Sequence, residues 1–263
     1  MTTTRSLVTP GDQTDLIGLE TADIPAGDFL EGQSDGELVA VVLSGVVDVA
    51  AGGERLGRAG GRRSVFDGPG YGVYLPPGTA FGLRAVDGPA EVVLATAPVE
   101  GAAPAAARLI RPEDQDIADR GAGNWSRQVR TMLGPGDEAG RLLLGETVNP
   151  PGNWSSYPPH KHDEHRPPVE ARLEEVYLFK MDPAGGFGVQ LRYDEAGTEA
   201  FTVRDGDVAA IRSGYHPVVA APGYALYYLW VMAGEGRQML PFLDPAHAWV
   251  QDRPGPTERS PEG

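Results

Sequence analysis

The chain of 263 residues is 41% hydrophobic and 22% charged, and its formal net charge is −15. These proportions are typical of a globular protein, and no segment approaches the ~20 consecutive apolar residues that a membrane-spanning helix needs. The acidic balance argues against a nucleic-acid partner, because the phosphates of nucleic acids need a positive surface. No apolar signal core follows the first residues, so we expect a cytoplasmic location.

The chain contains no cysteine, 36 glycines and 24 prolines. Without cysteine it can form neither disulfides nor metal thiolates, so a metal ion would have to be bound by imidazole and carboxylate groups. The many glycines and prolines favour short strands joined by tight turns over long helices. In the first hundred residues such strands are expected at 37–43, 45–50, 71–75 and 91–96.

The second half repeats this β-rich pattern after a small, alanine-rich segment at 101–107 that reads as a linker. Two similar halves predict an all-β protein built as a duplicated barrel, with a first barrel at 1–107 and a second at 108–251. Residues 252–263, which carry prolines among charges, are expected to form a disordered tail. The strands expected in the second half lie at 141–147, 175–179, 188–193, 200–203, 207–211 and 225–231.

The two halves differ in their histidines, because all five histidines lie in the second half. Residues 70–78 resemble residues 206–214, since each segment is a short strand opened and closed by glycine. His216 follows the second copy, but no histidine follows the first. We therefore expect only the second barrel to carry metal ligands.

His160 and His162 are one residue apart and would point to the same side of a strand, because side chains alternate with a period of two. A carboxylate from the next antiparallel strand can supply a third ligand, and Glu175 opens such a strand. Its neighbour Glu174 would then face the other way. His216, which follows a glycine turn, completes a predicted set of three histidines and one glutamate.

Such a set leaves one or two coordination positions open, as a catalytic metal site requires. Zn²⁺ is the first choice, and Mn²⁺ or Fe²⁺ accept the same donors. The alternative is that these histidines are unrelated surface and core residues. His165 lies in a polar loop and is expected to face solvent, whereas His247 is expected to be structural or to lie at a subunit contact.

The order His-x-His, Glu and Gly-x-His on separate strands resembles the cupin motifs. More closely, the chain resembles the 5-deoxy-glucuronate isomerases of bacterial myo-inositol catabolism, most strongly over residues 123–234. The gap between His162 and Glu175 is longer than in the general cupin pattern, so residues 163–173 are expected to form a loop over the site. The segments that carry the resemblance are 123–126, 129–130, 153–163, 174–177, 214–217 and 222–230.

The resemblance implies a bicupin and an aldose-ketose isomerisation, in which 5-deoxy-D-glucuronate becomes 5-dehydro-2-deoxy-D-gluconate. A proton leaves the carbon beside the carbonyl and returns to its neighbour, while the oxygens pass through an enediolate. A divalent ion would stabilise those oxygens as a Lewis acid, and a carboxylate or phenol would carry the proton. The 4-deoxy-5-ketouronate isomerases of pectin breakdown share this fold and ligand set, so the resemblance leaves the choice of uronate open.

The sequence does not single out the proton carrier. We take Glu174 and Tyr228 as the catalytic candidates, and strand alternation puts Tyr177 on the same face as Glu175. For any one tyrosine, filling the barrel interior is the simpler role. The other candidates are Glu164, Tyr157, Tyr193 and Tyr227.

A uronate substrate also needs a cation for its carboxylate, which arginine can bind through two hydrogen bonds. The candidates are Arg130, which follows an Asn-Trp-Ser motif, and Lys161, although its position between two inward histidines should turn it outward. Two other functions stay open, a ferrous cupin oxygenase with the same ligands and a non-catalytic sugar-binding or storage bicupin. Bicupins often self-associate, and Trp249 is compatible with a contact in a homo-oligomer.

Overall fold

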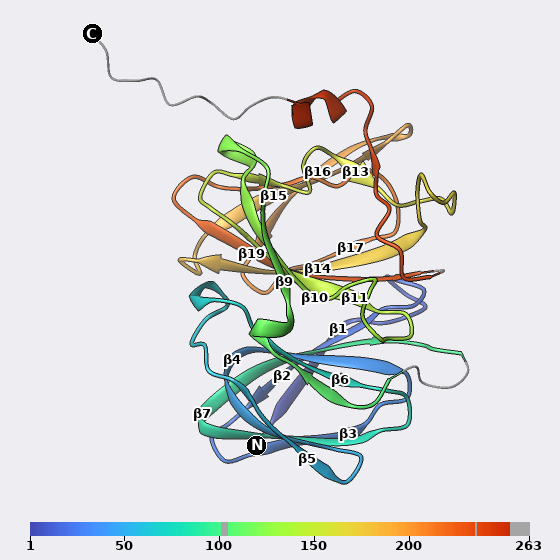
Figure 1. Cartoon of the computed structure of the whole chain (residues 1–263). Helices are drawn as coiled ribbons and strands as arrows, with labels where there is room; N and C mark the ends of the chain where they lie inside the picture. The colour runs from blue at the N-terminus through green and yellow to red at the C-terminus, as the bar shows by residue number, and fades with distance from the viewer. Residues whose placement is uncertain (101–104, 235, 253–263) are drawn as a thin grey trace.

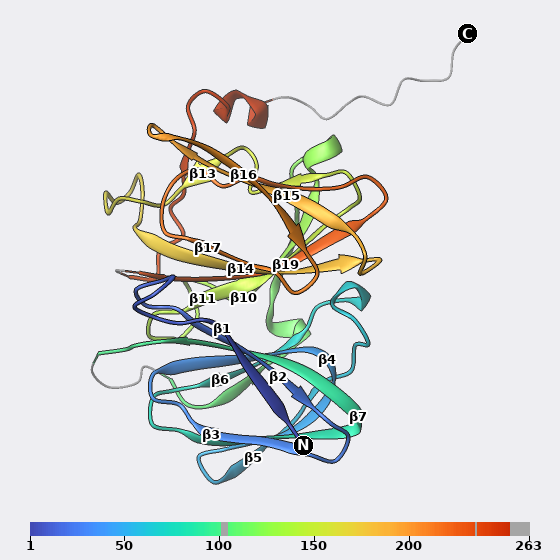
Figure 2. The same ribbon diagram turned by 180° about the vertical axis from the view of Figure 1, so that it is seen from behind.

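The computed structural model describes residues 1–100, 105–234 and 236–252. Over these residues the chain forms 20 β-strands and four short 3-10 helices but no α-helix, and hence none long and apolar enough to cross a membrane. Figures 1 and 2 show two rolled sheet structures stacked on one another, one from each half of the chain. The predicted all-β bicupin architecture is confirmed. The expected tail lies, apart from Asp252, outside the described residues.

The first barrel is an eight-stranded sheet in which β1, β2, β7, β4, β6 and β8 are successive neighbours, while β3 pairs with β7 and β5 with β4. The two strands expected at 37–43 and 45–50 are one long strand, β4, whose register shifts around Ser44. Such an irregularity lets a strand bend around a barrel. The strands are β1 (Thr3–Val8), β2 (Gly18–Ile24), β3 (Phe29–Gln33), β4 (Glu37–Ala51), β5 (Glu54–Gly60), β6 (Tyr71–Leu75), β7 (Ala80–Ala97) and β8 (Arg108–Ile110).

The second barrel contains a six-stranded sheet in the order β17-β14-β19-β11-β10-β9, a four-stranded sheet in the order β12-β18-β15-β16, and the pair β13-β20. Since β8 still belongs to the first barrel, the strands of the second begin at residue 116. They are β9 (Asp116–Arg120), β10 (Arg127–Leu133), β11 (Leu143–Asn149), β12 (Trp154–Ser155), β13 (His160–Lys161), β14 (Leu173–Asp182), β15 (Phe187–Asp194), β16 (Gly197–Arg204), β17 (Val208–Ile211), β18 (Val218–Ala220), β19 (Ala225–Gly234) and β20 (Phe242–Leu243).

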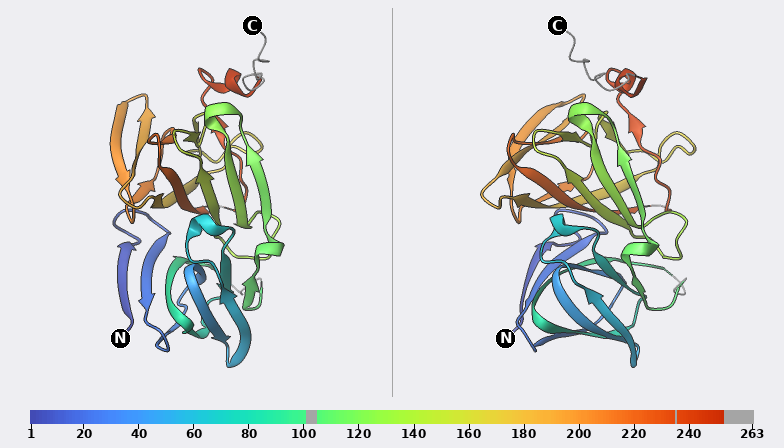
Figure 3. Two further views of the ribbon diagram at one scale, coloured as in Figure 1. Left: turned by 90° about the vertical axis from the view of Figure 1, so that its left-hand side faces the viewer. Right: turned by 60° about the vertical axis from the view of Figure 1, so that its left-hand side comes forward.

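The six-stranded sheet of the second barrel lies against the first barrel, and Figure 3 shows this stacking from the side. The side chains of this sheet alternate between the first barrel and the interior of the second. On β14, Val176 and Leu178 belong to a hydrophobic cluster shared with the first barrel. Tyr177 and Phe179 belong to a separate cluster inside the second barrel. Both faces of the strand are therefore buried, which explains its nearly continuous run of apolar residues.

Three carboxylates join the two barrels across this interface. Glu37 of the first barrel accepts hydrogen bonds from the backbone amides of residues 140–142. Glu174 of the second barrel accepts three from the amides of residues 15–17, at 2.6 to 2.8 Å. Glu146 forms a two-pronged ion pair with Arg62, at 2.5 and 3.1 Å. These charge-assisted bonds fix how the barrels stack.

Candidate metal centre and active-site pocket

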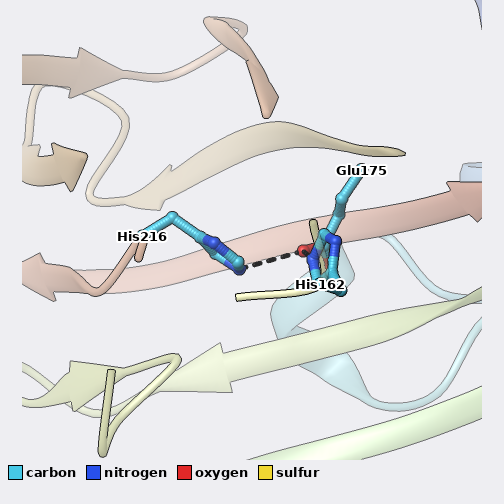
Figure 4. A group of neighbouring side chains, drawn as sticks. All are labelled: His162, Glu175 and His216. Atoms are coloured by element: carbon cyan, nitrogen blue, oxygen red, sulfur yellow. Dashed lines mark hydrogen bonds and ion pairs between the residues drawn. The ribbon is translucent and has the colours of Figure 1, made fainter. Parts of the chain in front are cut away.

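Three side chains from separate segments meet inside the second barrel. His162 follows β13, Glu175 lies on β14, and His216 follows the turn at Gly214 (Figure 4). The Nε2 atoms of His162 and His216 lie 3.1 and 3.2 Å from the same carboxylate oxygen, Oε2 of Glu175. The ligand atoms of the three residues all lie within 4.8 Å of one another, and the side chains are buried. Distant parts of the sequence thus supply one compact set of donors.

Hydrogen bonds on the far side of each ring orient the two imidazoles. Nδ1 of His216 lies 2.9 Å from the carbonyl oxygen of Gly214, and Nδ1 of His162 bonds the carbonyl oxygen of Leu173. A carbonyl oxygen only accepts hydrogen bonds, so each Nδ1 carries a hydrogen and each ring turns its Nε2 towards Glu175. Nε2 of His162 hydrogen-bonds Oε2 of Glu175 at 3.1 Å, whereas Nε2 of His216 has no hydrogen-bond partner among the described residues. Two imidazole nitrogens and a carboxylate oxygen that converge in this way fit a divalent metal ion.

His160, the fourth predicted ligand, lies beside this group. Its ring centroid is 4.8 Å from that of His216 and 6.3 Å from that of His162. Burial, and then the neighbouring His216 and His162, lower the pKa of His160 to about 3, so its ring is neutral at neutral pH and can offer a lone pair. The other two histidines, His165 and His247, do not line the pocket, and His165 is exposed as expected.

Glu175 is the charged member of the cluster. Burial opposes its ionisation, but the interactions of its carboxylate with His162 and His216 more than offset that effect and lower the pKa of Glu175 to about 2. The carboxylate is therefore negative over the whole neutral range. Its inward position follows from strand alternation on β14, since Tyr177 lines the same pocket while Glu174 does not.

His160, His162 and Glu175 form part of the wall of a pocket of about 300 Å³, and His216 lies beside them. Ligand pockets of this size hold small molecules. Apolar side chains such as Trp230, Met232 and Met239 cover much of the wall, so polar groups in it act at low dielectric. The polar and charged residues of the lining are Arg120, Arg127, Thr147, Ser156, His160, His162, Glu175, Tyr177 and Tyr228.

Two tyrosines of the pocket are held by two consecutive serines. The hydroxyl of Tyr228 lies 2.5 Å from Oγ of Ser155, and that of Tyr177 lies 2.8 Å from Oγ of Ser156. In a regular strand, adjacent serines would point to opposite faces. Ser156 instead has a φ of 49°, a left-handed conformation that non-glycine residues rarely adopt. This turn lets both serines bond the neighbouring tyrosines, and no residue pattern predicts it.

Arg127 and Arg120 also line the pocket and were not among the predicted site residues. Arg127 opens β10, and Arg120 ends β9. A signal for Arg127 did exist in the sequence. In a strand that starts directly after the Asn-Trp-Ser motif, Arg127 and Val129 share one face and Arg130 takes the other.

Glu174, predicted as a catalytic residue, is not in the pocket. Its carboxylate accepts hydrogen bonds from the backbone amides of Asp15, Leu16 and Ile17 in the first barrel. Those amides satisfy both carboxylate oxygens on the far side of the sheet from Glu175. Alternation along β14 is the physical reason, and the role of Glu174 is to join the barrels.

Arg130 and Lys161, predicted to bind the substrate carboxylate, do not line the pocket either. Arg130 reaches the interface, where Nη1 lies 3.6 Å from Oε2 of Glu146 and donates to the carbonyl oxygen of Gly68 at 2.7 Å. Lys161 turns outward, and its Nζ lies 3.3 Å from Oδ2 of Asp163. Both cations are already paired with carboxylates of the chain, so neither prediction holds.

The remaining proton-carrier candidates lie elsewhere. The hydroxyl of Tyr227 donates to Glu146 at the interface between the barrels, and that of Tyr193 donates to Asp244 at 2.6 Å. Glu164 is exposed, and Tyr157 lines a separate hollow. Of the tyrosines considered, Tyr228 and Tyr177 are therefore the two that line the same pocket as His160, His162 and Glu175.

Comparison with known proteins identifies the family. A family model described as the KduI/IolB family matches residues 3–250. The chain belongs to the KduI/IolB family. The 5-deoxy-glucuronate isomerase of Geobacillus kaustophilus is 41% identical over 240 residues, which are 90% of this chain and 86% of that protein. The 5-deoxy-glucuronate isomerase of Bacillus subtilis (strain 168) is 37% identical over 242 residues, which are 90% of this chain and 88% of that protein. This KduI/IolB family member is therefore an isomerase.

Solved structures place the family among bicupins. The crystal structure of an IolB-like protein from Salmonella typhimurium LT2 superimposes with a TM-score of 0.88 and 32% identity, and the match covers 94% of each chain. The oxalate decarboxylase of Lactobacillus farciminis, solved as a formate complex, matches with a TM-score of 0.65 and 11% identity over 95% of this chain and 86% of that chain. At that identity the second likeness concerns the fold alone.

Proposed function

We propose that this protein converts 5-deoxy-D-glucuronate to 5-dehydro-2-deoxy-D-gluconate with the help of a bound divalent metal ion. The observation that carries the proposal is the cluster of His160, His162, Glu175 and His216 at a pocket of about 300 Å³. A pocket of that size suits a six-carbon sugar acid. The names of the two curated relatives support the same substrate.

His160, His162 and His216 would hold the ion through nitrogen, and Glu175 would hold it through oxygen. Zn²⁺ is the first choice for such donors, with Mn²⁺ or Fe²⁺ as alternatives. When bound, the ion supplies Lewis-acid stabilisation of negative charge on the carbonyl oxygen and the adjacent hydroxyl oxygen of the substrate. The ionised Glu175 offsets part of the ion's charge in this buried place.

The isomerisation moves hydrogen between two neighbouring carbons. The C2–H bond breaks and its proton is delivered to C1, while the hydrogen of the C2 hydroxyl moves to the aldehyde oxygen. C1 becomes a hydroxymethyl carbon and C2 becomes a ketone, so no oxidant or reductant is consumed. The chain must supply groups that accept and return these protons inside the pocket.

Tyr228 is the proposed proton carrier. It lines the pocket, and Ser155 holds its hydroxyl through a hydrogen bond along which a proton can move. Tyr177 has a different proposed role. Burial, and then the charge of Glu175, raise the pKa of Tyr177 well above its usual range, so this hydroxyl keeps its hydrogen and can donate it to a substrate oxygen.

Tyr228→Phe is expected to lower kcat by about 100-fold, which is typical for the loss of a group that transfers a proton. The metal content should stay at the wild-type value, because Tyr228 is not among the proposed ligands. Steady-state kinetics together with metal analysis measure both effects. The matched control is Tyr227→Phe, on the opposite face of the same strand, which should retain kcat. Full turnover by the Tyr228 variant would remove this residue from the proton path.

The proposed function is tested by metal analysis of the purified protein and by assays with two uronates. Turnover of 5-deoxy-D-glucuronate should exceed that of 4-deoxy-5-ketouronate, should stop after chelation and should return when one divalent ion is restored. The reaction should proceed equally fast under nitrogen, since an isomerase needs no dioxygen. Preference for the second uronate would reassign the substrate, and a requirement for dioxygen would indicate an oxygenase.

A further inference from the structure

Arg127 and Arg120 lie opposite one another at the edge of the six-stranded sheet. They are direct partners in the antiparallel register of β10 and β9, so their side chains share one face of the sheet. Both line the same pocket as His160, His162 and Glu175. Two guanidinium groups therefore occupy the wall of the metal-ligand pocket.

Neither arginine has an acidic partner within the part of the chain that the structure describes. No aspartate or glutamate oxygen lies within 4.0 Å of a nitrogen of Arg120 or Arg127 in these residues, although the chain has 37 acidic side chains. Nη1 of Arg127 donates to the backbone oxygen of Trp125 at 3.2 Å. Its Nε is buried and has no hydrogen-bond partner in residues 1–100, 105–234 and 236–252.

This arrangement is costly for the protein on its own. Like charges directly opposite one another on neighbouring strands destabilise a sheet. A buried donor without a partner also loses the hydrogen bond that it would make with water. Burial also lowers the pKa of Arg127, because removal from water disfavours the charged guanidinium. An anion between the two arginines would relieve all three costs.

The anion is not provided by the pocket itself. Glu175 is the acidic residue of the lining, and its Oε2 already faces His162 and His216. A bound molecule must therefore bring the negative charge. Guanidinium groups bind a carboxylate through paired N–H···O bonds, and an apolar wall strengthens such bonds.

We propose that Arg127, assisted by Arg120, binds the carboxylate of the substrate and so selects sugar acids over neutral sugars. The inference rests on the proposed function, because it assumes that the aldehyde end of the substrate binds at the proposed metal ligands. In 5-deoxy-D-glucuronate the carboxylate terminates the carbon chain at the end opposite the aldehyde. Binding at both ends would fix C1 and C2 next to the hydroxyl of Tyr228.

Calorimetric titration of the metal-loaded protein with D-glucuronate and with D-glucose tests the proposal, because these sugars differ in one terminal carboxylate. The wild-type protein should bind glucuronate more tightly than glucose. Arg127→Gln should weaken glucuronate binding by roughly 10- to 100-fold, as expected for a lost hydrogen-bonded charge, while glucose binding stays unchanged. Arg127→Lys should give an intermediate loss of glucuronate affinity, because lysine keeps the charge but not the paired N–H donors of the guanidinium.

Arg5→Gln is the matched control, since it removes the same charge from an exposed position on the first barrel and should change neither titration. Metal content and thermal midpoint are measured for each variant to exclude unfolding. No preference for glucuronate in the wild type, or an unchanged glucuronate affinity in Arg127→Gln, would overturn the proposal. A protein that binds glucuronate through Arg127 but does not isomerise 5-deoxy-D-glucuronate would instead refute the proposed function alone.

Discussion

Replacement of Glu175 by glutamine is expected to remove the metal ion and to lower isomerase turnover about 1000-fold or more, because a catalytic metal contributes several kcal/mol of transition-state stabilisation. Glutamine has nearly the same volume, so the packing of the barrel should persist. In the wild type, Oε2 of Glu175 lies 3.1 and 3.2 Å from the Nε2 atoms of His162 and His216. The neutral amide of glutamine cannot supply the negative charge of that oxygen. Metal analysis and steady-state kinetics measure the two losses.

Glu174→Gln is the control for that experiment, since it makes the same chemical change one residue earlier. Its carboxylate bonds backbone amides of the first barrel, so the variant should keep its metal and its kcat. It should lose stability instead, by about 1.5–3 kcal/mol, as is typical of hydrogen bonds to a charged group. Metal loss in this variant with metal retained in Glu175→Gln would reverse the assignment of the two carboxylates.

Glu146→Ala is expected to destabilise the protein by about 3–5 kcal/mol, the usual cost of leaving a buried charge without its partner. The carboxylate is fully buried and bonds Arg62, while Nη1 of Arg130 lies 3.6 Å away. Its removal leaves the buried guanidinium groups of Arg62 and Arg130 without the carboxylate that balances their charge. For a chain of this size the thermal midpoint should fall by roughly 10 °C, which calorimetry or circular dichroism can follow.

An exposed ion pair provides the comparison for that prediction. Asp48 pairs with Arg55 and Arg58 on the surface of the first barrel. Asp48→Asn should leave stability nearly unchanged, because solvent screens exposed pairs. Equal and small effects of the two substitutions would contradict the role of Glu146 in holding the barrels together.

The parts of the site that the sequence predicted depend on local periodicity. The spacing of His160 and His162 and the start of the next strand at Glu175 indicate side chains that converge, and the structure brings them together with His216. The same alternation turns Glu174 away from the proposed metal ligands, and the structure shows that it faces backbone amides of the first barrel. Glycine-bounded strands likewise predicted a duplicated β-barrel, because turn residues act locally.

The parts that the sequence did not predict depend on how the two barrels pack. Arg127 and Arg130 lie on one strand and face opposite sides, and local sequence does not tell which side the first barrel covers. Arg130 bonds residues of that barrel, whereas Arg127 lines the pocket. The left-handed backbone at Ser156 is a second case, since a serine carries no sequence signal for that conformation.

The first barrel carries none of the proposed metal ligands, but it shields one face of the six-stranded sheet from solvent. Val176 and Leu178 on β14 belong to the same buried hydrophobic cluster as Val39 and Val41 of that barrel. Separation of the halves would expose this apolar surface to water and would break the ion pair between Glu146 and Arg62. The second half, expressed by itself, should therefore aggregate even though it carries every proposed metal ligand. The second half thus supplies the proposed reaction site, and the first half covers the apolar surface that would otherwise make it aggregate.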